Sequence, residues 1–383
     1  MNAKSIVFSV ILSLGTLITS AQGCVAIRGF SGCSTGLSNT FGSSKGELFV
    51  NTGFRYFKSF RHFRGSHEET ERIENGTEVI NKSYFMDISL TYGITDRLYG
   101  TLTVPLTHHN RSSMYEHGGN PPSGLGERHE TSARGLSDIR MGVGYWLVDP
   151  NKGKKYNYAL GLGLKLPTGN YEYKDNFYNQ GENRDETRYQ VVDQSIQPGD
   201  GGTGITVDVQ GFHILSDKFV LTSNLFYLLN PKETNGILTR SGTSEFSCPD
   251  QYAFRIGTFY NSKIQGLSLY TGGRVEGVPS NDLVGGSAGY RRPGYAISIE
   301  PGLAYSKNNF AVNVSVPIAV FRNRVQSYSD KQWTETTGEY KNGDAAFADY
   351  LLSFTFTYRI GGKHGEDMLM DFVPSWNEDA YQD

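Results

Sequence analysis

The clearest alternation of apolar and polar positions lies near the end of the chain, over 350–360. A period of two is typical of a β-strand, because successive side chains of a strand point to opposite faces. One face carries hydroxyl groups and a charge, and the other is too apolar to face water. Lipid outside and a wet interior fit this pattern better than the core of a soluble sandwich does. The apolar face is Tyr350, Leu352, Phe354, Phe356, Tyr358 and Ile360, and the polar face is Ser353, Thr355, Thr357 and Arg359.

The same pattern recurs along the chain and predicts twelve strands. Each is about 10–16 residues long, which is enough to cross a membrane at a tilt of about 45°. The predicted strands are 47–60, 82–94, 97–108, 136–148, 155–167, 202–214, 218–230, 251–261, 264–276, 293–306, 309–322 and 346–361.

The connections between these strands alternate between short and long. Short polar turns join every second pair of strands, and the connections between them are long, as periplasmic turns and external loops are in outer-membrane barrels. The long connections are 61–81, 109–135, 168–201, 231–250, 277–292 and 323–345. The sequence therefore predicts an all-β fold, a transmembrane antiparallel up-and-down β-barrel of about twelve strands with both termini periplasmic.

Composition supports a barrel over a helical membrane protein. The chain of 383 residues has 46 Gly, 24 Tyr and 22 Phe, its mean hydropathy is -0.42, and its mature part lacks the roughly 18 consecutive apolar residues of a transmembrane helix. Lipid leaves only helices and closed sheets able to satisfy the backbone. The net charge of -3 comes without a basic stripe, so no nucleic-acid partner is predicted.

The first 23 residues are typical of a signal peptide. Lys4 precedes an apolar stretch over 6–18, and Ala21-Gln22-Gly23 is a small-x-small cleavage site. The sequence thus predicts a signal peptide over 1–23, a periplasmic leader or plug over 24–46, the barrel over 47–361 and an acidic periplasmic tail over 362–383. The expected location is the outer membrane of a Gram-negative cell.

The mature chain is expected to begin at Cys24, nine residues before Cys33. A disulfide between these two is the preferred interpretation in an oxidising compartment, and lipidation of Cys24 is the alternative. Cys248 is then left over in a predicted external loop.

Charged residues fall on the predicted inner faces of the strands. They are candidates to line the lumen, either as a salt-bridge network that props the wall, which we favour, or as a basic-biased constriction that selects anionic solutes. The candidates are Arg55, Asp87, Arg140, Lys165, Asp208, Arg255, Arg274, Glu300 and Arg359.

Histidines gather near the first two external loops, and we interpret them as solvated loop residues rather than a metal site. They are His62, His67, His108, His109, His117 and His129. His109 with Ser112 or Ser113 is the nearest approach to a hydrolase pair, and there is no G-x-S-x-G motif. We therefore predict no enzyme, no catalytic residue, no metal and no cofactor. The aromatic-rich loop 168–201 is open to three interpretations: a cap over the pore, an inward constriction or a surface loop.

Four motifs carry a resemblance to a known family. They are Tyr92-Gly93-Ile94-Thr95-Asp96-Arg97-Leu98 followed by Val104-Pro105-Leu106, Gly135-Leu136-Ser137-Asp138-Ile139-Arg140, Gly161 to Gly169 (G-L-G-L-K-L-P-T-G), and Pro198-Gly199-Asp200-Gly201-Gly202. In this order the chain resembles the outer-membrane transporters named after the meta pathway of phenol degradation. The resemblance implies an outer-membrane barrel, often found beside the catabolism or efflux of aromatic compounds, and no catalytic residue.

The sequence leads to one functional prediction and two alternatives. The prediction is a channel or transporter for passive passage of small, aromatic or amphipathic molecules, with membrane lipid and a small-molecule solute as partners. The alternatives are a non-transporting surface barrel that binds a partner and, third, an outer-membrane lipase. The oligomeric state is left open.

Overall fold

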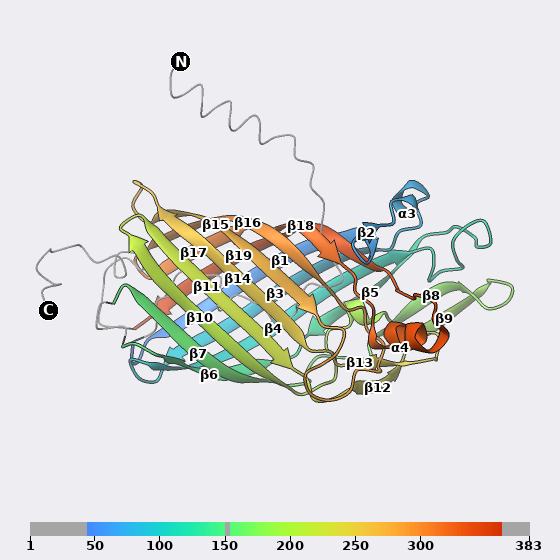
Figure 1. Cartoon of the computed structure of the whole chain (residues 1–383), viewed down its shortest axis with the longest axis horizontal. Coiled ribbons are helices and arrows are strands. Elements are labelled where there is room, and N and C mark those ends of the chain that lie inside the picture. The colour runs from blue at the N-terminus through green and yellow to red at the C-terminus, as the bar shows by residue number, and fades with distance from the viewer. Residues whose placement is uncertain (1–43, 150–153, 362–383) are drawn as a thin grey trace, which may run out of the picture.

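The computed structural model describes residues 44–149 and 154–361, which form one closed, tilted β-barrel (Figure 1). Every neighbouring pair of wall strands is antiparallel, and β1 pairs with β19 to close the sheet, with Phe54 opposite Phe354. The wall has twelve strand positions, as the sequence predicts. Two of these positions hold an interrupted strand, which the sequence does not predict. The wall strands are β1 (Leu48–Arg64), β3 (Ile80–Gly93), β4 (Leu98–Ser113), β5 (His129–Leu136), β6 (Arg140–Trp146), β7 (Tyr156–Lys165), β10 (Gly204–Ser216), β11 (Phe219–Leu229), β14 (Gln251–Asn261), β15 (Leu267–Val278), β16 (Gly294–Lys307), β17 (Phe310–Ser315), β18 (Ile318–Asn323) and β19 (Ala345–Ile360).

The predicted fourth strand, 136–148, is wrong in its outer part. The chain forms β5 and β6 instead, separated by 137–139, and these three residues face only two residues of β4. Pro105 of β4 stands at this β-bulge, where Ser137 N–H donates to its carbonyl at 2.8 Å. Because proline has no N–H to donate, the regular ladder is interrupted at this point. The eleventh strand is also interrupted, between β17 and β18, where Pro317 lies within the strand itself and its carbonyl accepts from Leu351 N–H at 3.1 Å.

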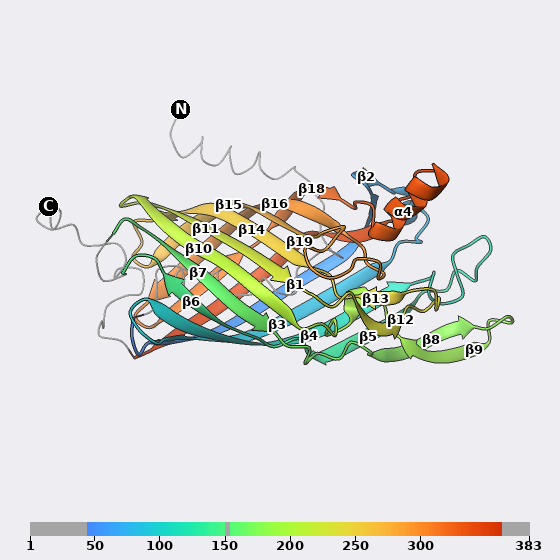
Figure 2. The same cartoon turned by 60° about the horizontal axis from the view of Figure 1, so that its bottom comes forward.

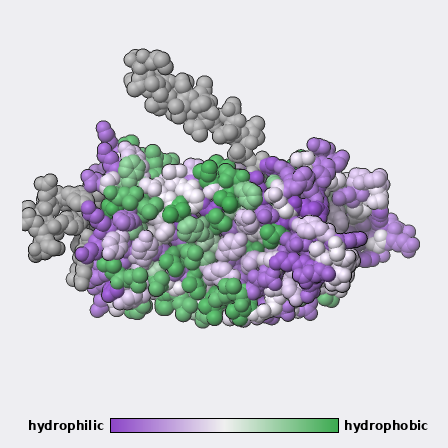
Figure 3. Space-filling model, viewed as in Figure 1, coloured by the Kyte–Doolittle hydropathy of each residue, from purple (hydrophilic) through white to green (hydrophobic). Residues whose placement is uncertain are grey.

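The two faces of the wall differ as the period-two pattern predicts. On β7, Leu160, Leu162 and Leu164 are exposed on the outside, and Ala159 and Lys165 are buried inside. Figure 3 shows apolar residues over the middle of the visible wall, with a hydrophilic region beyond them at the long-loop end. No helix in the described part of the chain is both long and apolar enough to cross a membrane.

The long connections contain secondary structure that the sequence analysis treats as loop. These elements gather at one end of the barrel (Figure 2), which we name the external end because long loops are external in outer-membrane barrels. They are β2 (His67–Glu68), α3 (Glu71–Glu74), β8 (Lys174–Gln180), β9 (Glu186–Val191), η3 (Gln194–Ile196), β12 (Thr234–Leu238), β13 (Glu245–Ser247) and α4 (Tyr328–Thr337).

The local sequence explains the longest of these elements. α4 begins after Ser327, whose hydroxyl accepts from Asp330 N–H at 3.1 Å while the Asp330 carboxylate accepts from Ser327 N–H at 3.0 Å. This reciprocal pair is a capping box. The helix ends at Gly338, whose φ of 75° lies in the left-handed region that favours glycine.

Candidate functional site: the lumen and its external vestibule

Arginines and carboxylates meet on the inner wall at mid-height. Arg55 lies 3.3 Å from Asp87, Arg255 lies 2.9 Å from Glu300, and Arg274 lies 2.7 Å from Glu276, each measured between a guanidinium nitrogen and a carboxylate oxygen. Arg55 is also within electrostatic range of Arg274, Arg140 and Glu276, so the charges of separate strands interact. Asp208 is likewise close to Arg140. We name these eight residues the central charged cluster: Arg55, Asp87, Arg140, Asp208, Arg255, Arg274, Glu276 and Glu300.

The cluster balances four arginines against four carboxylates. Six basic and three acidic residues are predicted to line the lumen. Two of the basic residues, Lys165 and Arg359, lie outside the cluster, and the prediction missed Glu276, which stands two residues after Arg274 on the same face of β15. A strand alternates faces, so the spacing of these two residues was the signal that could have identified the pair. The balance favours the salt-bridge network over an anion-selecting constriction.

Two of the candidate residues lie away from this cluster. Lys165 forms a salt bridge with Asp200 and lies 3.6 Å from Asp138, at the external end of β7. Arg359 lies at the periplasmic end of β19, with its guanidinium 3.4 Å from the side-chain oxygen of Asn309. The structure therefore brings seven of the nine sequence candidates together and places the other two near opposite ends of the lumen.

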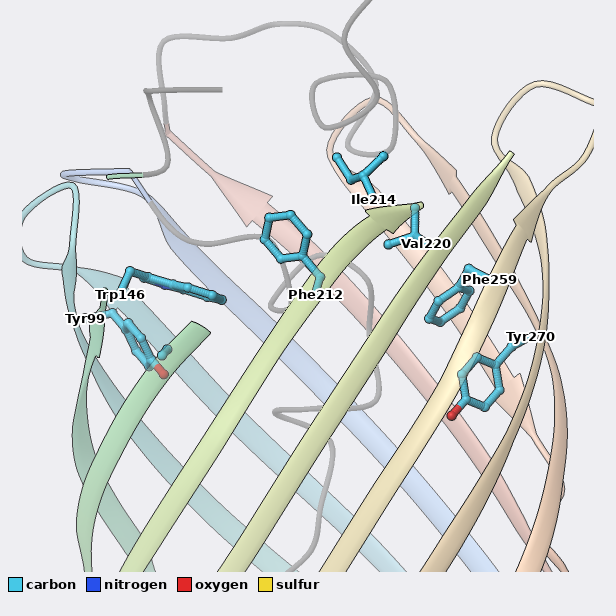
Figure 4. Packing of buried hydrophobic residues seen from close by; sticks show 9 residues of the cluster. Tyr99, Trp146, Phe212, Ile214, Val220, Phe259 and Tyr270 are labelled. Atoms are coloured by element: carbon cyan, nitrogen blue, oxygen red, sulfur yellow. The ribbon is translucent and has the colours of Figure 1, made fainter. Parts of the chain in front are cut away.

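An aromatic cluster fills the inner face at the periplasmic end, and the sequence analysis missed it. Figure 4 shows its side chains projecting from several strands near one rim. The ring centroids of Phe259 and Tyr270 are 4.7 Å apart, and those of Tyr99 and Trp146 are 6.2 Å apart. We name this the periplasmic cluster: Tyr99, Trp146, Ala159, Phe212, Ile214, Val220, Phe259, Tyr270 and Ala304. The sequence feature that could have revealed this cluster is a large residue at the inward position nearest the periplasmic end of several strands.

A cavity lies at the external end, between the barrel wall and the segments that cover it. It is partly open to solvent and has a cavity volume of about 90 Å³. We name it the vestibule. The wall contributes Phe57, Phe85, Gln251 and Val278, and the covering segments contribute Gln194, Ser195, Gln197, Gly199, Asp200, Asn235, Phe246, Ser247, Pro249, Arg291 and Arg292.

Buried ion pairs hold the covering segments over the mouth. Asp193 caps η3 by accepting from Ser195 N–H at 3.0 Å, and its carboxylate also binds Arg292 at 2.7 Å and lies 3.6 Å from Arg111 of β4. Burial would raise the pKa of Asp193, but the two guanidinium groups outweigh it and hold that pKa well below its usual range. Asp193 therefore ties the segment after β9 to the wall and to the segment before β16. Of the interpretations of 168–201, this arrangement matches the cap.

Three histidines are buried, so their interpretation as solvated loop residues is wrong. His62, His109 and His117 are 4%, 1% and 0% exposed. Burial lowers the pKa of His117 to about 4. A solvent-exposed histidine would keep a pKa near 6.5, so His117 is neutral at physiological pH.

One histidine belongs to the one group of potential metal ligands among the described residues: His62, Glu69 and Asp344. The Nε2 atom of His62 accepts from Val79 N–H at 2.9 Å, so the ring proton is on Nδ1, which lies 2.5 Å from the Asp344 carboxylate. Arg72 contacts both carboxylates, at 2.7 Å and 3.0 Å. The protonated ring nitrogen and the arginine occupy the positions that a cation would need.

The serine and histidine proposed as a hydrolase pair do not meet. Ser113 is four residues from His109 on β4, which separates them by about 13 Å along a strand. Ser112 points to the face opposite His109 by the alternation of the strand. Neither hydroxyl is within reach of the histidine for proton transfer.

The cysteine predictions are only partly accessible to the structure. Cys24 and Cys33 lie outside the described residues, as do the predicted signal peptide, most of the leader and the acidic tail. Cys248 is a buried free thiol, and its Sγ donates to the Asp200 carbonyl at 3.1 Å.

Comparison with known proteins agrees with the fold. A family profile described as "Putative MetA-pathway of phenol degradation" matches residues 70–324. An outer membrane channel of Pseudomonas putida F1 superposes with a TM-score of 0.55 at 12% identity, covering 84% of this chain and 98% of that one. The Ralstonia pickettii toluene transporter TbuX superposes with a TM-score of 0.42 at 11% identity, covering 85% and 92%. No curated protein matches the chain.

The family match covers about two thirds of the chain and includes all four motifs of the sequence resemblance. The closed sheet, the apolar outer wall and the polar inner face make the protein an outer-membrane barrel in contact with lipid. The chain belongs to the family described as "Putative MetA-pathway of phenol degradation".

Proposed function

We propose that the protein is an outer-membrane channel for passive passage of small aromatic or amphipathic molecules. The observation that carries this proposal is the pair of aromatic zones at the two ends of one lumen. Phe57 and Phe85 stand at the vestibule, and the periplasmic cluster stands at the other end. The outer-membrane channel with which the chain shares its fold supports the same class of function.

The central charged cluster gives the proposed path its selectivity. Paired charges of both signs provide hydrogen-bonding groups without a net field, so they disfavour the passage of an isolated ion. We propose that the nine charged candidates line this path, with Lys165 at its external end and Arg359 at its periplasmic end. An uncharged solute would meet aromatic rings, then polar groups, then aromatic rings.

Two measurements on the mature protein test this function. Ion conductance in a planar bilayer is compared between the full mature chain and a version lacking 24–46, and entry of small aromatic molecules is followed in proteoliposomes. Aromatic entry above that of empty liposomes supports the channel. Conductance from the shortened chain alone identifies 24–46 as a plug. The absence of entry and of conductance from both chains would refute the proposal.

The alternative is a barrel that binds a partner at the cell surface without transport. The ion-paired interior favours this alternative. Against it, the external end in Figure 3 is mainly hydrophilic rather than a broad apolar docking face. The lipase alternative loses its one candidate, because His109 and the two serines do not meet on β4.

A further inference from the structure

We propose that the outer face of the wall binds a phosphate group of an outer-leaflet lipid, at the external end of β1, β3, β4 and β5. The inference goes beyond the proposed function and does not depend on it, because this site faces the membrane rather than the lumen. These four strands are neighbours in the wall (Figure 1). The side chains that carry the inference, which we name the rim patch, are Lys58, Lys82, His108 and Arg134.

The rim patch points away from the lumen. All four of its residues are exposed, whereas the residue before each of them is buried. Because a strand alternates faces, the buried neighbours point inward and the patch points outward. The buried neighbours are Phe57, Asn81, Thr107 and Ala133.

The patch lies directly beyond the apolar part of the outer wall. One row of exposed apolar residues crosses the four strands: Phe54, Met86, Leu106 and Leu136. The next row toward the external end is Tyr56, Tyr84, His108 and Arg134, and the row after it contains Lys58 and Lys82. Successive rows are about 7 Å apart. Aromatic and then basic side chains beyond an apolar band are typical of the level of the lipid head groups.

The register of the strands places basic side chains next to each other. Lys58 of β1 stands directly opposite Lys82 of β3, and His108 of β4 stands directly opposite Arg134 of β5. Side chains in such positions are about 5 Å apart at Cβ, and like charges there destabilise the sheet. An anion bound between the strands would offset this repulsion.

Three cations of the patch have no ion-pair partner among the described residues: Lys58, Lys82 and Arg134. The Nζ of Lys58 lies 4.6 Å from the centre of the Phe60 ring, which leaves its charge without a counter-charge. Glu130, farther out on β5, accepts from the side-chain amide of Asn110 at 3.3 Å. The patch therefore has positive charge available for an anionic ligand.

The basic side chains are confined to one part of the rim. The row at the external ends of β11, β14, β15, β16 and β18 contains no charged residue. A general attraction to anionic lipid would not need the cations to be gathered on four adjacent strands, so their position indicates one site. The uncharged row is Tyr227, Tyr252, Gly277, Tyr295 and Asn323.

The chemistry of the patch favours a phosphorylated lipid over a free phosphate ion. Arginine offers a planar pair of N–H donors, lysine a compact ammonium group and histidine a ring N–H, and a phosphate has several oxygens to accept from them. The exposed apolar row beside the patch would contact the acyl chains of the same lipid molecule. Clusters of lysine and arginine at a membrane boundary recognise anionic head groups in this way.

The test measures binding of lipid A to the full mature protein in detergent, by titration followed with native mass spectrometry. The probes are lipid A with both phosphate groups, the same lipid without its phosphates, and inorganic phosphate as a competitor. Lys82→Gln and Arg134→Gln each remove one charge from the patch. Lys307→Gln is the matched control, because Lys307 is an exposed lysine at the periplasmic end of β16.

We expect Lys82→Gln and Arg134→Gln each to weaken lipid A binding about fivefold, and the double variant to weaken it roughly twentyfold. Lys82→Arg keeps the charge and should keep the affinity, and Lys307→Gln should leave it unchanged. The lipid without phosphates should bind weakly and to the same extent in every variant. The heat-dependent gel shift of a folded barrel reports whether each variant is folded.

Other outcomes overturn the inference. If the folded double variant binds lipid A as the unmodified protein does, the rim patch is not the site. Equal binding of the lipid with and without phosphates would refute recognition of the phosphate. A loss in Lys307→Gln as large as that in Lys82→Gln would mean a general effect of charge rather than a site. Displacement of lipid A by inorganic phosphate at an equal concentration would refute the lipid as the ligand.

Discussion

The two ends of the lumen are held by opposite kinds of interaction. At the external end, buried ion pairs around Asp193 fix the covering segments, whereas the periplasmic cluster is apolar packing around Trp146, which is 1% exposed. An ion pair is sensitive to charge and pH, and apolar packing is sensitive to the volume of its side chains. One mouth of the barrel should therefore respond to changes that leave the other unaffected.

The largest expected effect is that of Asp193→Ala. This change leaves Arg111 and Arg292 buried without their shared carboxylate, and breaking a buried pair in this way costs about 3–5 kcal/mol. We expect hydrogen exchange of 194–200 to become much faster and the vestibule to open. Asp185→Ala, at the exposed tip between β8 and β9, is the control and should leave the exchange unchanged. Equal protection in both variants would mean that the ion pairs do not hold the cap.

Trp146→Leu should act on the other mouth. The substitution removes buried ring volume and is expected to lower the free energy of unfolding by about 2–3 kcal/mol, because the surrounding side chains refill the space only in part. Urea unfolding of the purified barrel would measure the loss. Exchange at 194–200 should stay as in the unmodified protein, and faster exchange there would show that the two ends are coupled.

Acidification should separate the two ends without any mutation. The pKa of Asp193 is lower in the folded protein than its unfolded value of about 3.9, so its contribution to stability is complete above that value and is lost as the pH falls through the folded one. The stabilisation that Asp193 gives the cap should therefore be constant from pH 8 to about pH 5 and be lost below about pH 4. Hydrogen exchange at 194–200 across this range, corrected for the pH dependence of the intrinsic exchange rate, tests it. The periplasmic cluster contains no carboxylate, and weakening there at the same pH would contradict the distinction.

The smallest effect is expected for Arg188→Ala. Arg188 and Glu186 form a 2.7 Å ion pair on β9, with side chains that are 49% and 53% exposed. Exposed pairs contribute roughly 0–1 kcal/mol. The urea unfolding curve should therefore differ little from that of the unmodified protein. This result would show that only the buried ion pairs of the external end contribute much to its stability.

The wall of the barrel was predictable because the residue pattern of each strand is enough to identify that strand. Alternation along β7 or β19 identifies the inner and outer faces without knowledge of any neighbour. The bulge after Leu136 was not predicted, because it depends on Pro105 of another strand. His62 and His109 were misinterpreted for a similar reason: each lies in the outer part of a strand, β1 or β4, where the sequence predicts a loop, and each is buried.

The vestibule and the cap could not be derived from the sequence. Phe57, Asp193, Gln251 and Arg292 lie far apart along the chain and meet through the closure of the sheet and the folding of three long connections. Local patterns do not show which arginine reaches which carboxylate of another strand. The central charged cluster was partly predicted, because alternation along a single strand shows which side chains point inward. The ion pairs between strands form only when the barrel is complete.

The pairing of β1 with β19 also determines how the protein can assemble. Phe49 and Arg359, which stand opposite each other at this seam, are separated by almost the whole barrel sequence. Until β19 pairs with β1, the two outermost strands of the unfinished sheet have unpaired backbone edges. Lipid does not tolerate such edges, and other chains can pair with them. A chain that stops before β19 would leave a sheet with two open edges, so a late truncation should be as harmful to assembly as an early one.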